Sequence, residues 1–236
     1  MLLLENNKVR DCFTLARCIF ETTINACFIA GNGQTTESQA VKHAVQKAHR
    51  EKQRRFTFRH TPLNVGWPHG PVPPNHPMVV AALAEYTSKK GREITSWTQE
   101  AIEERIEAIE KWLGPEIGDR LRFAMFSIYR DSSEIIHGTL YSVLSFAGTW
   151  NIPAQSRSKL TMEGYHRALA TTLSLQVAGC LNTAIRAACR LSGDDNNASV
   201  ANDVLRAVKE APWAKGLKIS PDGYPMRDPL KNPTGI

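Results

Sequence analysis

The stretch from Lys8 to Ala30 constrains the fold most, because apolar residues occur on almost every side of the helix that it predicts. The sequence Gly31-Asn32-Gly33 comes directly after it and is typical of a helix C-terminus. A helix that is apolar nearly all round belongs in the middle of other helices. These apolar residues are Phe13, Leu15, Cys18, Ile19, Phe20, Ile24, Cys27, Phe28 and Ile29.

The rest of the 236-residue chain shows helical periodicity and no sustained alternation with a period of two. We therefore expect an all-α fold, a helical bundle whose two longest later helices form a central antiparallel hairpin around the loop NIPAQSRS. The predicted helices after the first one cover about 37–55, 78–90, 96–113, 119–147, 161–191 and 198–210.

Prolines and glycines set the predicted domain boundaries. Residues 60–77 contain six prolines, which exclude a regular helix or a central strand and predict an extended connection. We expect a single helical-bundle domain over residues 1–211 that includes this connection. The remaining residues, 212–236, form a tail rich in proline and glycine.

The cysteines indicate the cellular compartment. Their number, five, is odd and no CxxC pair occurs, so they are expected to be buried free thiols in a reducing compartment. The opening MLLLENNK is too short for a signal-peptide core, and no run approaches 18 uninterrupted apolar residues. We expect a cytoplasmic protein that does not span a membrane.

The positive charge of the chain is concentrated in one segment. Seven basic residues between positions 42 and 59 face only Glu51, an excess of +6 that equals the net charge of the whole chain. Basic patches of this kind commonly bind phosphate backbones, so RNA is an expected partner, although a solvated helix face that binds nothing is the simpler alternative. The seven residues are Lys42, Lys47, Arg50, Lys52, Arg54, Arg55 and Arg59.

The predicted helix 119–147 carries a polar stripe on one face. Arg130 and His137 differ by only about 20° in azimuth, and Glu134 lies between them. Arginine binds phosphate through its planar fork, and histidine moves protons near neutral pH. Together they could make an RNA 2′-hydroxyl attack the adjacent phosphodiester without a metal.

The first helix has a second polar stripe, formed by Arg17, Glu21 and Asn25 at intervals of four residues. Buried charges must be paired, so these residues could simply pair with one another or with Arg130 and hold helices in register. The alternative is functional: the two stripes face each other across a small polar cavity, where Glu21 and Glu134 orient the catalytic groups. Residues of helix 161–191 such as Thr171 and Ser174 could complete that cavity.

The segment RDSSEIIH resembles the signature of the HEPN superfamily (higher eukaryotes and prokaryotes nucleotide-binding domains). That signature is an arginine, a polar residue and, after four to six intervening residues, a histidine; here Arg130 precedes Asp131, and six residues separate it from His137. The resemblance implies a helical bundle, commonly dimeric, with arginine and histidine as the catalytic pair of a metal-independent ribonuclease of a toxin or anti-phage system. No cofactor is implied.

The helix containing RCIFETTIN, together with the later helix containing YRDSSEIIHG, is also similar to an uncharacterised bacterial family of unknown function. This similarity covers about residues 8–150. It adds no activity to the ribonuclease hypothesis.

Three other function classes have weaker support. Glu134-Ile-Ile-His137 and Glu163-Gly-Tyr-His166 have the ExxH spacing of di-metal bundles, but the predicted hairpin separates them by roughly 15 Å in height. The three histidines of the proline-rich connection are too dispersed for a zinc site, so no metal site is expected. A non-catalytic helical binding or scaffold protein, with both polar stripes structural, stays open as the main alternative.

Overall fold

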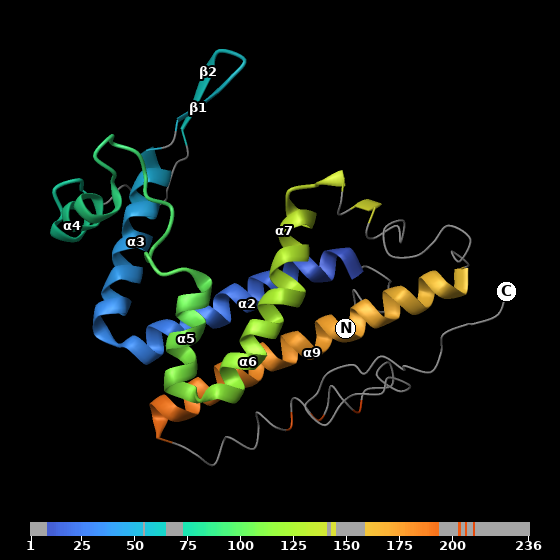
Figure 1. The fold of residues 1–236 in the computed structure, drawn as a ribbon. Coiled ribbons are helices and arrows are strands. Elements are labelled where there is room, and N and C mark those ends of the chain that lie inside the picture. The colour runs from blue at the N-terminus through green and yellow to red at the C-terminus, as the bar shows by residue number, and fades with distance from the viewer. Residues whose placement is uncertain are drawn as a thin grey trace. The chain divides into compact units, whose positions relative to one another are not determined.

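The computed structural model describes residues 9–53, 55–64, 73–140, 143–144 and 159–193, together with Asp203, Arg206 and Glu210. In these residues helices dominate, and the all-α prediction is confirmed (Figure 1). The described chain has two compact units where the sequence suggested one domain. Unit 1 comprises Met1–Cys27 with Ile102–Ile236, and unit 2 comprises Phe28–Ala101.

Helix α2 (Val9–Asn32) agrees with the sequence prediction to within two residues, and Gly33 ends it in the left-handed region at φ +71°. Within unit 1 only one side of α2 is buried: Phe13, Phe20 and Ile24 are at most 3% exposed. Leu15, by contrast, is 53% exposed, and Cys18 is also exposed. The expectation that this helix is enclosed on all sides therefore holds for one face only.

Helices α5 (Ile102–Leu113) and α6 (Pro115–Ala124) pack against each other around the turn at Gly114. Ile106 and Ile109 of α5 are buried, as their helical spacing requires. The two helices approach closely at Gly118, where a Cβ atom would lie 2.7 Å from Cδ of Glu110. This close approach explains why α6 has a glycine at this position.

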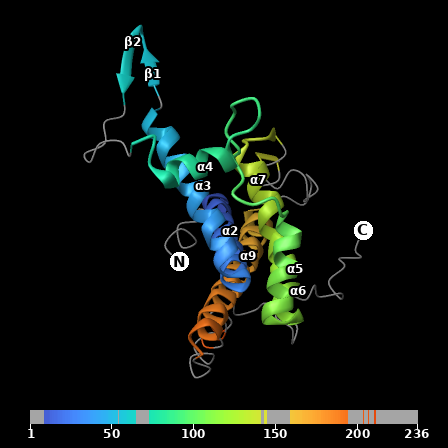
Figure 2. The ribbon, with the colours of Figure 1, turned by 90° about the vertical axis from the view of Figure 1, so that its left-hand side faces the viewer.

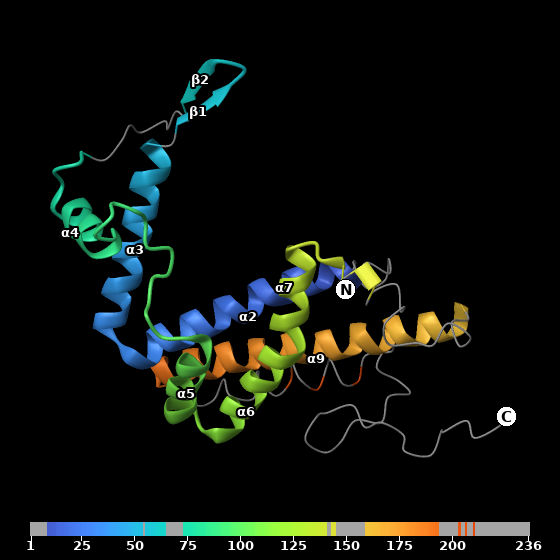
Figure 3. The same ribbon diagram turned by 45° about the horizontal axis from the view of Figure 1, so that its top comes forward.

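The helix expected over 119–147 is continuous only as far as Ile136, and the described residues Leu140, Val143 and Leu144, beyond Gly138, are helical again. After α6 come a π-helical segment, η1 (Met125–Tyr129), and then helix α7 (Arg130–Ile136). Figure 3 shows that the ribbon of α6 continues into α7. Gly138 has φ +62°, a conformation that favours glycine, and it ends α7. The predicted extension of the helix through Gly138 was therefore wrong.

Helix α9 (Lys159–Ser192) matches the expected helix at 161–191 and ends before Gly193 at φ +66°. It packs against α6 and η1. By length and composition alone, α2 and the Gly164–Ser192 part of α9 could each cross a membrane; the core helix of a soluble protein passes the same test. Of the expected helix 198–210, only Asp203, Arg206 and Glu210 are described, and they are helical; the tail 212–236 lies outside the described residues.

Unit 2 consists of α3 (Gln34–Gln53), strands β1 (Arg55–Phe58) and β2 (Thr61–Asn64), and α4 (Pro77–Tyr86), as Figure 2 shows. Helices α3 and α4 pack together. Tyr86 joins them to the next segment, because its hydroxyl contacts the carbonyl of Gln39 at 3.0 Å and that of Trp97 at 2.8 Å. Of the expected proline-rich connection over 60–77, residues 65–72 lie outside the described residues.

The β1–β2 hairpin was not predicted from the sequence. Its antiparallel register pairs Arg55 with Asn64 and Phe58 with Thr61, and the two turn residues Arg59 and His60 have φ +46° and +71°. Two-residue hairpin turns normally take Gly, Asn or Asp at such positions, and this turn has none of them. The usual sequence signal of the turn is therefore missing.

Candidate active site

One face of the η1–α7 helix is packed against α2. The Ser132 hydroxyl, fully buried, donates to the carbonyl of Phe13 at 2.9 Å. Tyr129 approaches α2 in the same way, with its ring 6.3 Å from that of Phe20 between centroids. Ile128 and Ile135, on the same side of the helix as Ser132, are also buried. This face of the helix thereby belongs to the core of unit 1.

The predicted polar stripe occupies the opposite face. At about 100° per residue, Arg130 and His137 lie about 140° to 160° from Ser132. Both side chains are exposed, and Glu134 between them is half-buried. Neither the Arg130 nor the His137 side chain makes a hydrogen bond or ion pair with another residue that the structure describes. The stripe therefore faces outward as one surface, and its basic groups are available to a ligand.

His137 is held at the C-terminal end of α7 by backbone hydrogen bonds. Its own N–H donates to the Ser133 carbonyl at 3.0 Å. The N–H of Gly138 then donates to the carbonyl of Ile135 at 3.1 Å and the N–H of Thr139 to that of Glu134 at 3.2 Å. This pair of reversed bonds around a left-handed glycine is a Schellman motif. The backbone at His137 is consequently fixed relative to Arg130.

The two carboxylates of the stripe have different surroundings. Oε2 of Glu134 accepts a hydrogen bond from the Thr139 hydroxyl at 2.8 Å, which ties the carboxylate to the end of α7. Burial raises the pKa of the Asp131 carboxyl, and the neighbouring Arg130 only partly opposes this rise. Asp131 thus lies at the edge between the packed and the exposed face, and Glu134 lies closer to His137.

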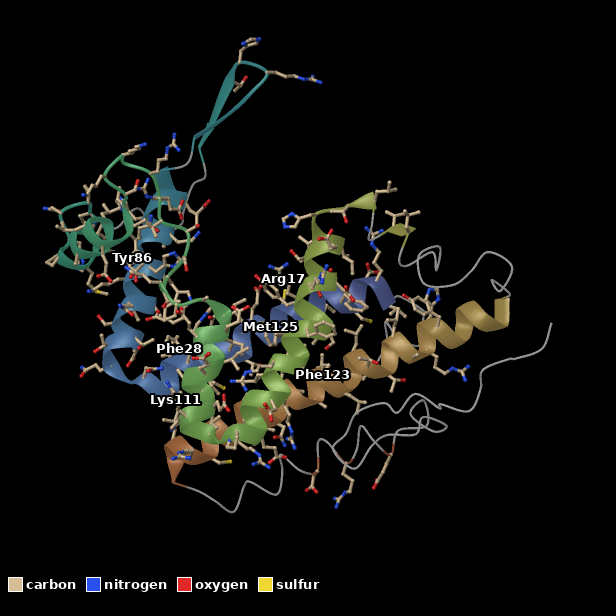
Figure 4. The ribbon with its side chains drawn as sticks, in the orientation of Figure 1. Arg17, Phe28, Tyr86, Lys111, Phe123 and Met125 are labelled. Atoms are coloured by element: carbon tan, nitrogen blue, oxygen red, sulfur yellow. The ribbon has the colours of Figure 1, made fainter. Side chains whose placement is uncertain are left out.

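The polar stripe of α2 does not meet the stripe of α7. Arg17 pairs with Glu21 of its own helix at 2.8 Å, and its guanidinium lies 4.5 Å from the centroid of the Tyr129 ring. Figure 4 shows Arg17 on α2 beside the helix that carries Met125. Asn25 accepts a hydrogen bond from Arg105 of α5. The described contacts of the α2 stripe therefore lead to its own helix, to Tyr129 and to Arg105.

Tyr129 and Arg105 could not be recognised from the sequence as partners of the α2 stripe. Both lie more than 75 positions away along the chain, so only the packing of η1 and α5 on α2 identifies them. Arg17 and Asn25 accordingly have structural contacts of their own. Glu21, proposed as a catalytic orienting group, has no described contact with Arg130, Glu134 or His137.

The hydroxyl groups of α9 that were expected to line the cavity are used within α9. Thr171 donates to the carbonyl of Arg167 and Ser174 to that of Ala170, each at 2.9 Å. Thr171 is also 1% exposed. These residues are therefore part of the helix packing and do not face the Arg130–His137 surface with a free hydroxyl.

No group of three or more His, Cys, Asp or Glu side chains suited to a metal ion occurs in the described part of the chain. The side chain of Glu163, from the second ExxH pair, lies outside it. His60 and His76 are exposed, and His69 is not described. The structure thus offers no described donor set to test for a di-metal or zinc centre.

Three residues of the basic patch make contacts within unit 2. Lys42 pairs with Glu85 at 2.8 Å and Lys47 with Glu93 at 3.0 Å. Arg50 donates to the Thr87 hydroxyl at 2.9 Å. These partners lie in α4 and the segment after it, outside the basic segment 42–59. The patch predicted from the local charge excess is therefore partly neutralised.

The remaining four basic residues of the patch lie between positions 52 and 59 of the sequence. Arg59 is exposed in the β1–β2 turn. The side chains of Lys52, Arg54 and Arg55 lie outside the described residues.

The fold and the site together define a helical protein with an exposed Arg–Glu–His face on a helix that is otherwise packed. The chain belongs to a family of unknown function, DUF5677, whose model matches residues 1–152. The match includes both α2 and the Arg130–His137 surface. No curated protein and no solved structure matches the chain.

Proposed function

We propose that this protein is an endoribonuclease that cleaves RNA without a metal ion, with Arg130 and His137 as its catalytic pair. The observation that carries this proposal is the exposure of both side chains on the face of α7 that points away from the packed Ser132. An arginine needed only for packing would be turned toward a neighbouring helix, as Arg17 is.

The proposed reaction uses one proton acceptor and one phosphate-binding group. His137 takes the proton of the RNA 2′-hydroxyl, whose oxygen attacks the adjacent phosphorus and displaces the 5′-oxygen of the next nucleotide. The products are a 2′,3′-cyclic phosphate and a 5′-hydroxyl, whose proton comes from water, and His137 afterwards releases the proton it accepted to the solvent. The guanidinium of Arg130 binds the non-bridging phosphate oxygens and stabilises the charge that develops on them.

The geometry of α7 is compatible with these roles. The two residues are about 10 Å apart along the helix axis. The Cα–Cβ bond of His137 leans toward the N-terminus of α7 and so toward Arg130, and the flexible arginine side chain can span the remaining distance. Glu134, tied to Thr139, would interact with the imidazole from one turn away.

The test measures cleavage of a labelled, unstructured RNA by purified protein in buffer containing EDTA. We expect cleavage by the wild type, with cyclic phosphate ends, and a loss of about 10² to 10⁴ in rate for His137→Ala. Arg130→Ala should lose activity as well. Two exposed residues outside this surface, His76 and Arg190, provide the matched controls His76→Ala and Arg190→Ala.

Two results would contradict the proposal. One is the absence of any RNA cleavage by the wild type, with or without EDTA. The other is a His137→Ala variant that cuts as fast as the wild type.

A second candidate, a non-catalytic helical scaffold, is favoured by the α2 stripe alone. Arg17 pairs with Glu21 and lies over the ring of Tyr129, and Asn25 accepts a hydrogen bond from Arg105. The polarity of this stripe therefore has a structural explanation. This candidate predicts that RNA is neither bound nor cut.

A further inference from the structure

Phe126 is unusual among the aromatic residues of this protein. Its side chain is 72% exposed, and no other Phe, Tyr or Trp side chain that the structure describes is exposed. Burying a phenylalanine side chain typically stabilises a protein by about 1.5 to 3 kcal/mol. An aromatic ring left in water on a well-packed helix forgoes that stabilisation.

Phe126 lies on the same face as the proposed catalytic pair. It precedes Arg130 by four residues, the spacing at which side chains are neighbours on a helix surface. The exposed stripe thus runs from Phe126 through Arg130 and Glu134 to His137. The residues between them that are buried, Ile128, Ser132 and Ile135, form the opposite face.

The π-helical segment fixes this arrangement. Phe126 is its second residue, while Ile128 in the same segment is fully buried. The Ser127 hydroxyl donates to the carbonyl of Phe123 at 2.8 Å, which adds a side-chain bond to the backbone bonds at the start of the segment; Phe123 and Met125 are labelled in Figure 4. Short π-helical segments within α-helices occur frequently at functional sites. The ring is therefore carried by a continuous helix and needs no loop rearrangement to meet a ligand.

The combination of groups on this face suits one class of ligand. An aromatic ring provides a flat surface on which any nucleobase can stack, and an arginine one turn away binds a phosphate. Bases are accessible for stacking in single-stranded RNA, whereas in a duplex they are already stacked on one another. A purely apolar partner would leave Arg130 and His137 without a counterpart.

We propose that Phe126 is a base-stacking residue that holds one nucleobase of single-stranded RNA beside the phosphate bound by Arg130. This inference rests on the proposed ribonuclease function and adds a substrate preference to it: unpaired RNA of any sequence is favoured over duplex RNA. Phe126 is a substrate-binding residue in this scheme and takes no part in proton transfer.

The test uses the full chain with His137→Ala, so that RNA binding is measured without cleavage. Fluorescence anisotropy gives the Kd for a labelled single-stranded oligonucleotide, for a duplex of the same sequence and for the same strand with abasic sites. Into this background are introduced Phe126→Ala, Phe126→Leu and Phe126→Trp. Leu140→Ala is the matched control, because Leu140 is also 72% exposed but has no ring.

We expect Phe126→Ala and Phe126→Leu to weaken binding of the intact single strand by about 5- to 100-fold. Phe126→Trp should bind as well or better, and Leu140→Ala should not change the Kd. The abasic strand should bind all variants equally weakly, since it has no base to stack. The duplex should bind more weakly than the single strand to the protein with Phe126, and the two should become similar in Phe126→Ala.

Three results would overturn the inference. If Phe126→Ala and Phe126→Leu bind intact RNA as well as the parent, the ring does not stack on a base, while wild-type cleavage would still support the ribonuclease. If Phe126→Ala instead changes only the molecular mass in sedimentation, the ring is a contact between two copies of the chain. If wild-type protein neither binds nor cleaves RNA, the proposed function itself fails, and the cleavage assay shows this independently of Phe126.

Discussion

The hydroxyl of Ser132 donates to the backbone carbonyl of Phe13 at 2.9 Å, and this bond fixes which face of α7 is turned to α2. Ser132 is fully buried, so rotating α7 would leave its hydroxyl without an acceptor. With Ser132 turned inward, Arg130 and His137 are turned outward. The proposed function depends on this rotational setting, which the stability of arginine variants can test.

Arg17 and Arg130 each lie in a polar stripe of a helix, but their replacement by alanine should change the free energy of unfolding by different amounts. Arg17→Ala should lower the free energy of unfolding by about 1 to 2 kcal/mol, because it removes the ring contact with Tyr129 and the pair with Glu21. Arg130→Ala should change it by less than about 0.5 kcal/mol, since Arg130 is exposed. Urea unfolding measures both. Equal and large losses would mean that Arg130 is a packing residue and would argue against the ribonuclease.

Asp131→Asn should stabilise the protein at neutral pH. Burial raises the pKa of Asp131 in the folded state, so the folded protein holds this proton more tightly than the unfolded chain. Stability from this group is present below the unfolded pKa and is lost as the pH rises through the folded pKa. At pH 7 the ionised carboxylate is therefore unfavourable, and an uncharged amide removes the penalty.

We expect Tm to rise by roughly 1 to 3 °C for Asp131→Asn at pH 7 and the gain to disappear near pH 4, where the carboxyl of the parent is increasingly protonated. Glu107→Gln, a change at an exposed position of α5, should have little effect at either pH. A Tm that falls at pH 7 would mean that the charge of Asp131 has a stabilising partner.

Gly118→Ala should destabilise unit 1 although alanine favours helices. The added Cβ would lie 2.7 to 2.8 Å from Cβ, Cγ and Cδ of Glu110, and Cβ cannot move without the backbone of α5. Glu110 is also bonded to Arg122, which limits its movement further. We expect a loss of about 1 to 3 kcal/mol in urea unfolding.

Gly179 provides the control for this prediction. A Cβ at Gly179 meets nothing within 4 Å, so Gly179→Ala in the middle of α9 should stabilise the protein by up to about 1 kcal/mol. A Gly118→Ala variant as stable as Gly179→Ala would contradict the close approach of α5 and α6.

The cysteines should differ in reactivity. Burial raises the pKa of Cys27 to about 11 and that of Cys180 to about 12, the negative charge of a Cys27 thiolate adding to the second rise. Almost no thiolate therefore exists at these two positions at pH 8, whereas Cys18 is exposed. Ellman's reagent should react rapidly with Cys18 in the native protein and with Cys27 and Cys180 only after unfolding. Rapid native reaction of the last two in a Cys18→Ser variant would show that α2 and α9 do not bury them.

The positions of several helix ends are predictable from the sequence because local chemistry determines them. Gly33 and Gly193 adopt positive φ, as expected of glycines after a helix, and α2 and α9 end next to them. Gly138 also has a positive φ and ends α7. The sequence did not indicate this helix end, because apolar residues at helical spacing continue beyond Gly138. The π-helical segment at Met125–Tyr129 has no sequence signal of its own and depends on how η1 packs on α2 and α9.

Part of the candidate site was predictable from the sequence, because local helical geometry determines which residues share a face. Helical geometry alone places Arg130, Glu134 and His137 on one face, and the structure shows them there. Which neighbour that face meets depends on packing between distant segments, so the expected cavity with Glu21 stays a prediction, and the described contacts of the α2 stripe lead instead to Tyr129 and Arg105. The ion pairs of Lys42 and Lys47 show the same limit, since their partners Glu85 and Glu93 lie about 45 residues later.

The Schellman motif at the end of α7 makes the spacing of Arg130 and His137 independent of the chain beyond Thr139. The amide hydrogen bonds of His137, Gly138 and Thr139 all return to α7 itself, so the last turn is closed by its own backbone. Lengthening, shortening or replacing the chain after Thr139 should leave Arg130 and His137 in register. That junction is accordingly a tolerant point for inserting a reporter or a linker while the exposed face of α7 is kept intact.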